Sequence, residues 1–286
     1  MKTSLKSLFV GIFLSAMPAH AVVYTWSGLA ADGDWANAGN WDGNGVPVDF
    51  QGGSAGLEFE TSTSDRIVIN SSLANSPATN VPALYALNGT SATPAIDVLN
   101  GSVTFDISSS ISGEVVLVGA YTSTIGDGNA GNGTATLTYN TNSWFHRTGG
   151  TMATTINSDG ALVFNDPTFS LSYNTDRIYE ATLAGGSITI LGEVTDILRN
   201  DPGVGSNWFD FTQAGASFTA DFGGDLADLA TVNGYIGAAN LFRSSTALTL
   251  QATDNMDGSF TVTTIPEPSA ALLGGMGVLL LLRRRR

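Results

Sequence analysis

Residues Ile96 to Ile107 read IDVLNGSVTFDI, and apolar residues alternate there with polar ones on both sides of an Asn-Gly pair. A period of two is the pattern of a β-strand with one buried face. Helical periodicity is nearly absent from the rest of the chain, so the sequence predicts an all-β protein. The same alternation appears in eight other short runs: LEFE, RIVIN, EVVLVG, TATLTYN, SITILGEV, ASFTADF, TALTLQAT and GSFTVTTI.

Asn-Gly and Asp-Gly pairs divide these runs from one another. They begin at residues 32, 42, 44, 88, 100, 127, 132, 159, 233 and 257. Both dipeptides tolerate the positive φ angles of tight turns. We therefore expect a turn at each pair.

Two architectures fit short strands separated by turns: an antiparallel β-sandwich and a right-handed parallel β-solenoid. Loose internal similarity favours the solenoid, because Leu87–Thr90 (LNGT) resembles Leu99–Ser102 (LNGS), and Thr148–Met152 (TGGTM) resembles Ala184–Ile188 (AGGSI). Stacked coils produce repeats of this kind. The β-sandwich remains the alternative.

One segment has helical rather than strand spacing. GDLADLATVNG, from Gly224 to Gly234, predicts a short helix with Asp225 as its N-cap and Asn233-Gly234 as its stop. Such a helix would cover the open end of a solenoid, where strand edges and core are otherwise exposed.

Charge limits the partners of the chain. Its net charge is −14, and residues 22–264 hold 24 acidic residues, five arginines and no lysine. This field repels nucleic acid and anionic lipid headgroups, so we exclude both as partners of the body. Cysteine is absent, which removes disulfides and thiolate metal sites.

The N-terminus has the three parts of a signal peptide. Lys2 and Lys6 are basic, an apolar stretch follows, and Ala19-His20-Ala21 matches the small-x-small rule of signal peptidase. Because the apolar stretch is short and ends at Pro18, a transmembrane helix fits less well. We expect signal peptidase to cut after Ala21.

The C-terminus combines Pro266-Glu267-Pro268, an apolar stretch from Ala270 to Leu282, and four arginines, Arg283, Arg284, Arg285 and Arg286. These parts, in this order, closely resemble the PEP-CTERM sorting signal of proteins exported by Gram-negative bacteria. The resemblance implies that the chain is the substrate of a membrane-embedded exosortase. It also implies transient anchoring in the inner membrane and delivery to the cell surface or extracellular matrix.

A weaker resemblance covers Tyr24 to Phe50. This segment is similar to the Trp-rich opening of secreted bacterial proteins with autotransporter-associated β-strand repeats, and the residues that carry the match are Trp26, Trp35, Asn40, Trp41 and Pro47. The resemblance implies that a parallel β-helix begins here. Trp26, Trp35 and Trp41 either plug the first coil or form a stacking platform for sugars, which makes them candidate glycan contacts.

The sequence divides into five parts on this interpretation. They are a signal peptide (1–21), a Trp-rich N-terminal cap (22–56), a solenoid body (57–223), a C-terminal cap (224–264) and the sorting signal (265–286).

Residues for catalysis are scarce. After removal of the signal peptide one histidine remains, His146, which is too few for a zinc site and leaves a Ser-His-Asp triad one candidate base. Glycosidases need only two carboxylates, but no local cluster of acidic residues lies on a predicted strand. We therefore expect no catalytic residues and no organic cofactor.

Calcium is the candidate inorganic partner. Asp32–Trp35, Asp127–Gly133 and Asp254–Gly258 offer oxygen ligands in Gly-rich loops, although none matches the twelve-residue EF-hand loop. The alternative is that each is a turn in which the Asp side chain binds neighbouring backbone N–H groups.

The function that these observations favour is a non-enzymatic, exported protein of the cell surface or extracellular matrix. The second hypothesis is a module that binds polysaccharide through its N-terminal tryptophans. The third is a glycan-cleaving β-helix enzyme.

Overall fold

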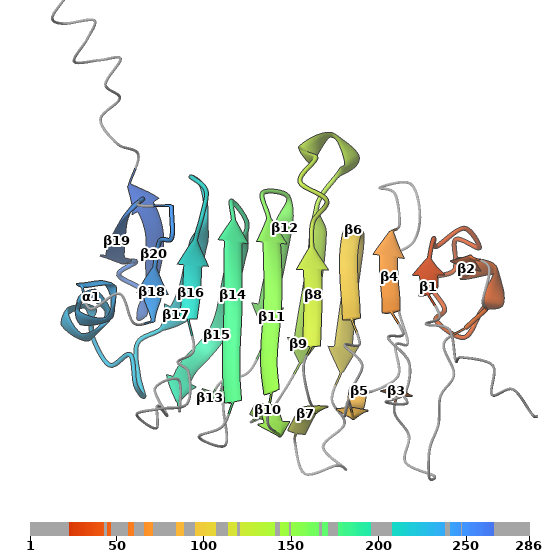
Figure 1. The fold of residues 1–286 in the computed structure, drawn as a ribbon, viewed down its shortest axis with the longest axis horizontal. Helices are drawn as coiled ribbons and strands as arrows, with labels where there is room; N and C mark the ends of the chain where they lie inside the picture. Colours follow the sequence, from red (N-terminus) through yellow and green to blue (C-terminus); the bar gives the residue numbers. More distant parts are fainter. Residues whose placement is uncertain are drawn as a thin grey trace, which may run out of the picture.

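A computed structural model describes residues 23–42, 45–46, 57–59, 66–70, 84–88, 95–106, 114–118, 121–140, 144–148, 150–165, 168–170, 177–195, 208–237, 241–246 and 248–265. Most of these residues lie in strands, so the all-β prediction is confirmed. Figure 1 shows the strands side by side in an elongated array, with chain order following its long axis.

A first sheet contains one strand from each successive turn of the chain. In spatial order it comprises β1 (Val23–Trp26), β4 (Arg66–Asn70), the first half of β6 (Ala95–Asp106), β8 (Tyr121–Ile125), β11 (Gly150–Asn157), β14 (Arg177–Ala184), β16 (Trp208–Phe211) and β18 (Phe242–Arg243). All these neighbours pair in parallel. At its N-terminal edge β1 also pairs antiparallel with β2 (Trp41–Asp42).

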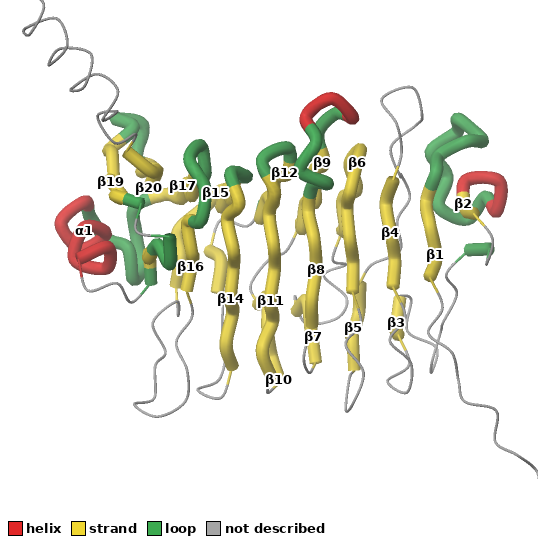
Figure 2. Tube along the Cα trace, turned by 45° about the horizontal axis from the view of Figure 1, so that its top comes forward, coloured by secondary structure: helices red, strands yellow, loops and turns green. Residues whose placement is uncertain are grey.

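A second sheet follows the first in chain order. It comprises the second half of β6, β9 (Ala135–Asn140), β12 (Gly160–Phe164), the first part of β15 (Ser187–Thr195) and β17 (Ser217–Asp221), all parallel. It ends in two antiparallel strands, β20 (Ser259–Ile265) and β19 (Thr249–Asp254). In Figure 2 the strands of this sheet lie along the top of the molecule.

A third row of parallel strands completes each turn. It comprises β3 (Leu57–Phe59), β5 (Leu84–Asn88), β7 (Glu114–Val118), β10 (Trp144–Thr148), β13 (Thr168–Ser170) and the end of β15. From β6 to β17 the chain visits the first, second and third rows in turn, and then returns to the first row one step further along. Hydrogen bonds between neighbouring steps join residues 24 to 35 positions apart. Antiparallel pairing of described strands occurs only at the two ends, so the β-sandwich alternative does not describe this topology.

Equivalent apolar side chains stack in columns inside the array. On the first sheet the column contains Val98, Ile125, Ile156, Leu183 and Phe211, each at most 1% exposed. The second sheet contributes a parallel column, Val103, Leu137, Leu162, Ile188 and Phe218, at most 1% exposed as well. Burying one such side chain contributes about 1.5–3 kcal/mol, so the columns supply the main driving force for stacking. The alternation read from IDVLNGSVTFDI therefore marks the inward and outward faces of β6.

The internal similarities seen in the sequence do not mark equivalent positions. Gly101 and Gly186 both lie at the corner between the first and second sheets, next to Ala135 and Ser217 respectively. Gly150, however, begins β11 on the first sheet. Gly150 and Gly186, which correspond in the two similar segments, therefore lie at different corners. The segments resemble each other because any sharp corner selects small residues.

Two of the predicted turns are wrong. Asn100-Gly101 lies inside β6, which passes the corner as one continuous strand with Gly101 at a φ of 87°. Asn233-Gly234 lies inside the helix α1 (Leu229–Gly237). These pairs permit positive φ but do not require a chain reversal.

The helix begins three residues later than the predicted N-cap implies, at Leu229. The carboxylate of Asp228, not Asp225, accepts the backbone N–H of Thr231 at 2.7 Å. Asp225 instead donates its own backbone N–H to the carbonyl of Val194 at 3.0 Å. Buried Leu226 lies in the turn before the helix, and α1 packs against β19 and β18 at the C-terminal end of the array (Figure 1).

Candidate functional site

The residues predicted to direct export lie outside the described part of the chain. These are the signal peptidase site, Ala19 and Ala21, and the sorting residues Pro266, Glu267, Pro268 and Arg283 to Arg286. Among the described residues, no helix is both long enough and apolar enough to cross a membrane.

The three N-terminal tryptophans form one buried cluster. Trp26, Trp35 and Trp41 are 0%, 2% and 6% exposed. The rings of Trp26 and Trp35 stack at 5.9 Å between centroids, and Trp41 meets them edge-on at 5.2 and 4.5 Å. Its indole N–H donates to the carbonyl of Trp35 at 2.8 Å. The prediction that these residues contact glycans is therefore corrected, because a sugar ring has no exposed indole face to stack on; their position fits the plug.

Asn40 holds the loop that carries these tryptophans. Its side-chain amide donates to the carboxylate of Asp32 at 2.6 Å and to the carbonyl of Asp34 at 3.0 Å. Its side-chain oxygen accepts the backbone N–H of Ala30 at 2.9 Å. Asn40 is fully buried, so every one of these bonds replaces water inside the cap. The Asn-Trp pair singled out in the sequence thus joins a polar centre to the aromatic cluster.

A second loop repeats part of this design. Asn37-Ala38-Gly39-Asn40 and Asn129-Ala130-Gly131-Asn132 are identical, and each forms a short 3₁₀ turn, η1 (Ala38–Asn40) and η2 (Ala130–Asn132). In each, the first Asn accepts the Gly N–H and the last Asn donates to an upstream Asp. The two copies lie 92 positions apart in the sequence, and their exact identity is the signal by which the shared turn could be predicted.

The carboxylates proposed for calcium accept hydrogen bonds within their own turns. Asp32 accepts the Asn37 and Asn40 amides, and these bonds lower its pKa below the usual 3.8. Asp127 accepts the Asn132 amide at 2.6 Å and the Asn129 N–H, with the same effect on its pKa.

The third loop, at the tip of the β19–β20 hairpin, is built in the same way. Asp254 accepts the backbone N–H of Met256 at 2.8 Å, and Asp257 accepts both the N–H and the hydroxyl of Ser259. Across the described ranges, no three His, Cys, Asp or Glu side chains come close enough together to hold a metal ion. The three loops are therefore turns in which Asp side chains bind nearby donors.

Asp159 anchors the loop between β8 and β9. Its carboxylate accepts the backbone N–H groups of Asp127 and Gly128 at 3.1 and 2.9 Å. The neighbouring Asn157 amide donates to the carbonyl of Gly126 at 2.7 Å. Since Asp159 comes from the next coil, it fixes a protruding loop to the corner beneath it.

His146 lies in β10, where its backbone pairs with Leu117 of β7. Its side chain lies outside the described part of the structure.

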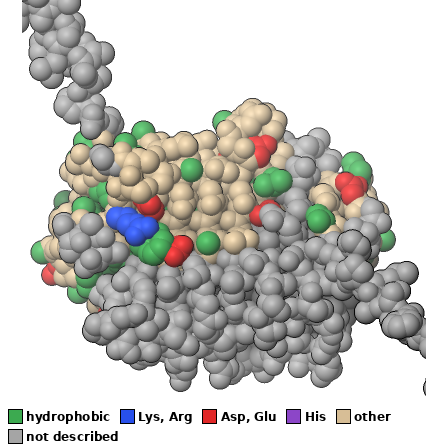
Figure 3. All heavy atoms as spheres, viewed as in Figure 1, with side chains coloured by type: hydrophobic (Ala, Val, Ile, Leu, Met, Phe, Trp, Pro, Cys, Tyr) green, Lys and Arg blue, Asp and Glu red, His purple; other side chains and the backbone are tan. Residues whose placement is uncertain are grey.

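The structure brings together four polar or aromatic residues that are scattered in the sequence. On the outer face of the first sheet Glu180 pairs with Trp208, and Asp210 pairs with Arg243. The Arg243 guanidinium lies 3.7 Å from the Trp208 ring centroid, and its Nε lies 3.7 Å from Asp210. Figure 3 shows basic atoms beside acidic and apolar side chains on this face. No local sequence motif predicts this group, because its members come from three separate strands, β14, β16 and β18.

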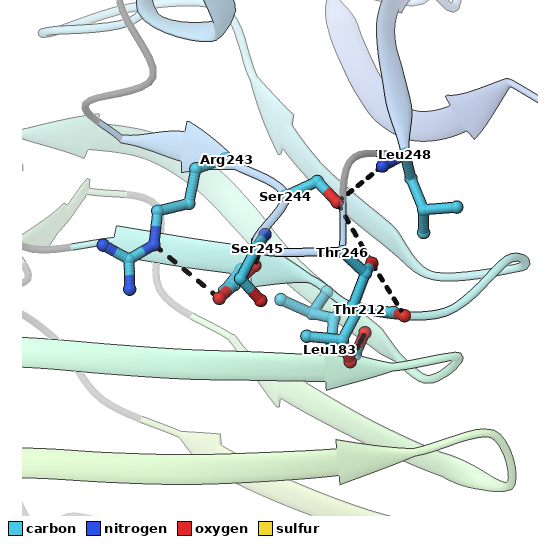
Figure 4. Close-up of polar contacts among 8 residues, drawn as sticks. Leu183, Thr212, Arg243, Ser244, Ser245, Thr246 and Leu248 are labelled. Carbon is cyan, nitrogen blue, oxygen red and sulfur yellow. Dashed lines mark hydrogen bonds and ion pairs between the residues drawn. The ribbon is translucent and has the colours of Figure 1, made fainter.

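Hydrogen bonds around this group join β18 and the residues after it to the preceding coil (Figure 4). Asp210 also accepts the backbone N–H of Ser245 at 2.7 Å, and Thr246 donates to the carbonyl of Thr212 at 3.0 Å. Burial raises the pKa of Glu180, and the nearby Arg243 charge opposes that rise. Asp210 and Arg243 neutralise one another, so this group, which we call the latch, joins β18 to β16.

Comparison with protein-family models, with curated protein sequences and with solved structures found no match.

Proposed function

We propose that this chain is a non-enzymatic, exported β-solenoid of the cell surface or extracellular matrix of a Gram-negative bacterium, sorted by an exosortase through its C-terminal PEP-CTERM signal. The observation that carries the proposal is the order of Pro-Glu-Pro, apolar stretch and arginine tail, joined directly to a body of stacked parallel strands.

The architectural part of the proposal is a right-handed parallel β-solenoid. It is supported by the cyclic visit to three rows of strands and by parallel pairing from β1 to β18. Connections between parallel strands of one sheet are right-handed in almost all proteins, for reasons of strand twist. The Trp cluster at one end, and α1 with the β19–β20 hairpin at the other, cover the ends of the stack.

The non-enzymatic part rests on what the polar groups already bind. The Asp residues of the three Gly-rich loops accept hydrogen bonds inside their turns, and Asp210 is neutralised by Arg243. Such groups stabilise the coils and have little capacity left for a substrate. Incubating the mature protein with acidic and neutral polysaccharides should therefore release no new reducing ends and no unsaturated products. Turnover that disappears in Glu180→Gln would refute this part.

Sorting follows from the chemistry of the tail. A 13-residue helix from Ala270 to Leu282 would be about 20 Å long, shorter than the hydrocarbon core of about 30 Å, and the arginine side chains would reach toward the interface. Four arginines keep the C-terminus in the cytoplasm, so Pro266-Glu267-Pro268 would face the outer side of the inner membrane. That position is open to a membrane-embedded exosortase.

The test is localisation of the full-length protein in a host that carries an exosortase. Replacing Arg283 to Arg286 with Ser should release or mislocalise the uncut precursor, and replacing Pro266-Glu267-Pro268 with Ala should trap it in the inner membrane. Ser269→Ala, next to the motif, is the matched control and should be sorted normally. If all variants reach the surface with the mature mass of the wild type, the tail is not a sorting signal.

A further inference from the structure

The outer face of the second sheet carries two columns of short hydroxyl side chains. Outward positions two residues apart repeat on six neighbouring strands, and their register is set by backbone pairing. Ten of these twelve positions are Ser or Thr, and the other two, Ala161 and Val163, share the strand β12. We call this set the hydroxyl face: Ser102, Thr104, Thr136, Thr138, Ala161, Val163, Ser187, Thr189, Ser217, Thr219, Thr261 and Thr263.

The hydroxyl face is a rigid two-dimensional grid. Strands of a sheet lie about 4.8 Å apart, and alternate residues along a strand lie about 6.7 Å apart. Threonine is branched at Cβ and keeps few rotamers, so each hydroxyl and methyl has a defined position. All twelve side chains are at least partly exposed. At the end of the grid, the hydroxyls of Thr219 and Thr261 lie 3.0 Å apart, in hydrogen-bond contact across the strands.

The first sheet of the same molecule provides an internal comparison. Its equivalent columns contain Thr122, Thr124, Ala153, Thr155 and Thr182, but also Glu180, Trp208 and Arg243 and the buried carboxylates Asp97 and Asp210. The two hydroxyl columns contain no charged or aromatic side chain, whereas the next outward positions of the same strands carry Asn140, Leu191 and Asp221. Preference for strand-forming residues acts on every outward position alike, so it does not explain why these two columns hold almost only Ser and Thr. In a chain of net charge −14, this face is uncharged at every grid position.

These features restrict the partner to one kind of surface. An uncharged face offers nothing to an ionic partner, and a face without aromatic rings lacks the platform that grips sugar rings. A grid with regular spacing gains most from a partner that is itself periodic. Hydroxyls that bind liquid water must immobilise it at a cost in entropy, whereas water in a crystal is already ordered.

We propose that the hydroxyl face binds the surface of ice crystals. Each hydroxyl has one donor and two acceptor positions that can join the hydrogen-bond network of an ice surface, and the Thr methyl groups fill the spaces between them. This inference does not depend on the sorting tail, and its failure would leave the proposed function untouched.

The experiment uses the mature wild-type protein, a face variant carrying Thr138→Lys and Thr189→Lys, and a matched control carrying Thr155→Lys and Thr182→Lys on the first sheet. All four positions are half-buried and face outward from parallel strands. The readouts are the fraction of protein incorporated into slowly growing ice and the inhibition of ice recrystallisation. Circular dichroism confirms that each variant is folded.

We expect the wild type and the matched control to enter ice and to inhibit recrystallisation, and the face variant to lose both activities. Should the face variant fail to fold, Thr138→Ser with Thr189→Ser, which removes only two methyl groups, is expected to weaken both activities. Equal activity of the wild type and the folded face variant would overturn the proposal. So would a wild type that is excluded from ice, including one that binds crystalline cellulose or chitin instead.

Discussion

Replacing Gly160 with Ala should strongly destabilise the stack for a steric reason. Gly160 is the first residue of β12 and lies at the corner between the first and second sheets. A Cβ added there would meet the carbonyl oxygen of Ile125 at 2.2 Å, its carbonyl carbon at 2.7 Å and the carbonyl oxygen of Asn157 at 3.1 Å. Its φ is not positive, so backbone strain does not contribute.

The magnitude follows from how little the neighbours can move. The atoms in the way belong to backbone, and Ile125 is paired in the parallel ladder with Ile156. Overpacking of a well-packed interior costs about 1–3 kcal/mol, and a backbone clash of this depth places Gly160→Ala at the upper end, about 3 kcal/mol. For a domain of this size that corresponds to a fall in Tm of about 6–12 °C.

Denaturant and thermal unfolding of the mature protein measure this effect. Gly234→Ala is the control, because an added Cβ there has nothing within 4 Å and the residue lies inside α1. Alanine is the better helix former by about 1 kcal/mol, so this variant should be more stable than the wild type. A Gly160→Ala protein as stable as the wild type would show that the corner is not as tight as described.

Three further predictions concern the cap, the turns and the latch. Trp35→Ala should lower the free energy of unfolding by about 3–5 kcal/mol in denaturant melts, because it empties the cap; saturable sugar binding that this variant loses on a glycan array would contradict the plug. The pKa of Asp127 is lowered in the folded state, so its stabilising effect is present above the usual value of 3.8 and is lost as pH falls through the lowered pKa. The free energy of unfolding of Asp127→Asn should therefore fall less steeply with decreasing pH than that of the wild type. An equally steep fall in both proteins would show that the Asp127 carboxylate does not stabilise the turn. Arg243→Gln should cost about 1–3 kcal/mol by leaving Asp210 without its cation, and adding Asp210→Asn should recover part of that loss; strictly additive costs in the double-mutant cycle would mean that the two side chains do not interact.

Strand content could be predicted because it depends on neighbours in sequence. All nine runs read as strands contain or overlap a strand, and TATLTYN shows the cleanest alternation, from Ala135 to Asn140. Asn-Gly and Asp-Gly pairs were less reliable. Asn100-Gly101 bends a continuous strand and Asn233-Gly234 continues a helix, because a residue that tolerates positive φ only permits a turn.

The start of α1 shows how tertiary context overrides a local signal. The sequence predicted Asp225 as the N-cap. The backbone N–H of Asp225 is taken by the carbonyl of Val194 in the preceding coil, which leaves Asp228 to cap the helix. A bond between residues 31 positions apart cannot be read from spacing alone.

By itself the sequence determined the all-β class, the inward and outward faces of the strands, and the gathering of aromatic residues before the first coil, because alternation and composition act through local geometry and burial. Only the tertiary structure decided which strands pair, which corners are equivalent, and which outward side chains share a surface. Pairing brings together residues roughly 30 positions apart, and many registers would bury similar apolar area. The hydroxyl face and the Asp210–Arg243 latch exist only in the register that backbone hydrogen bonds and packed corners select.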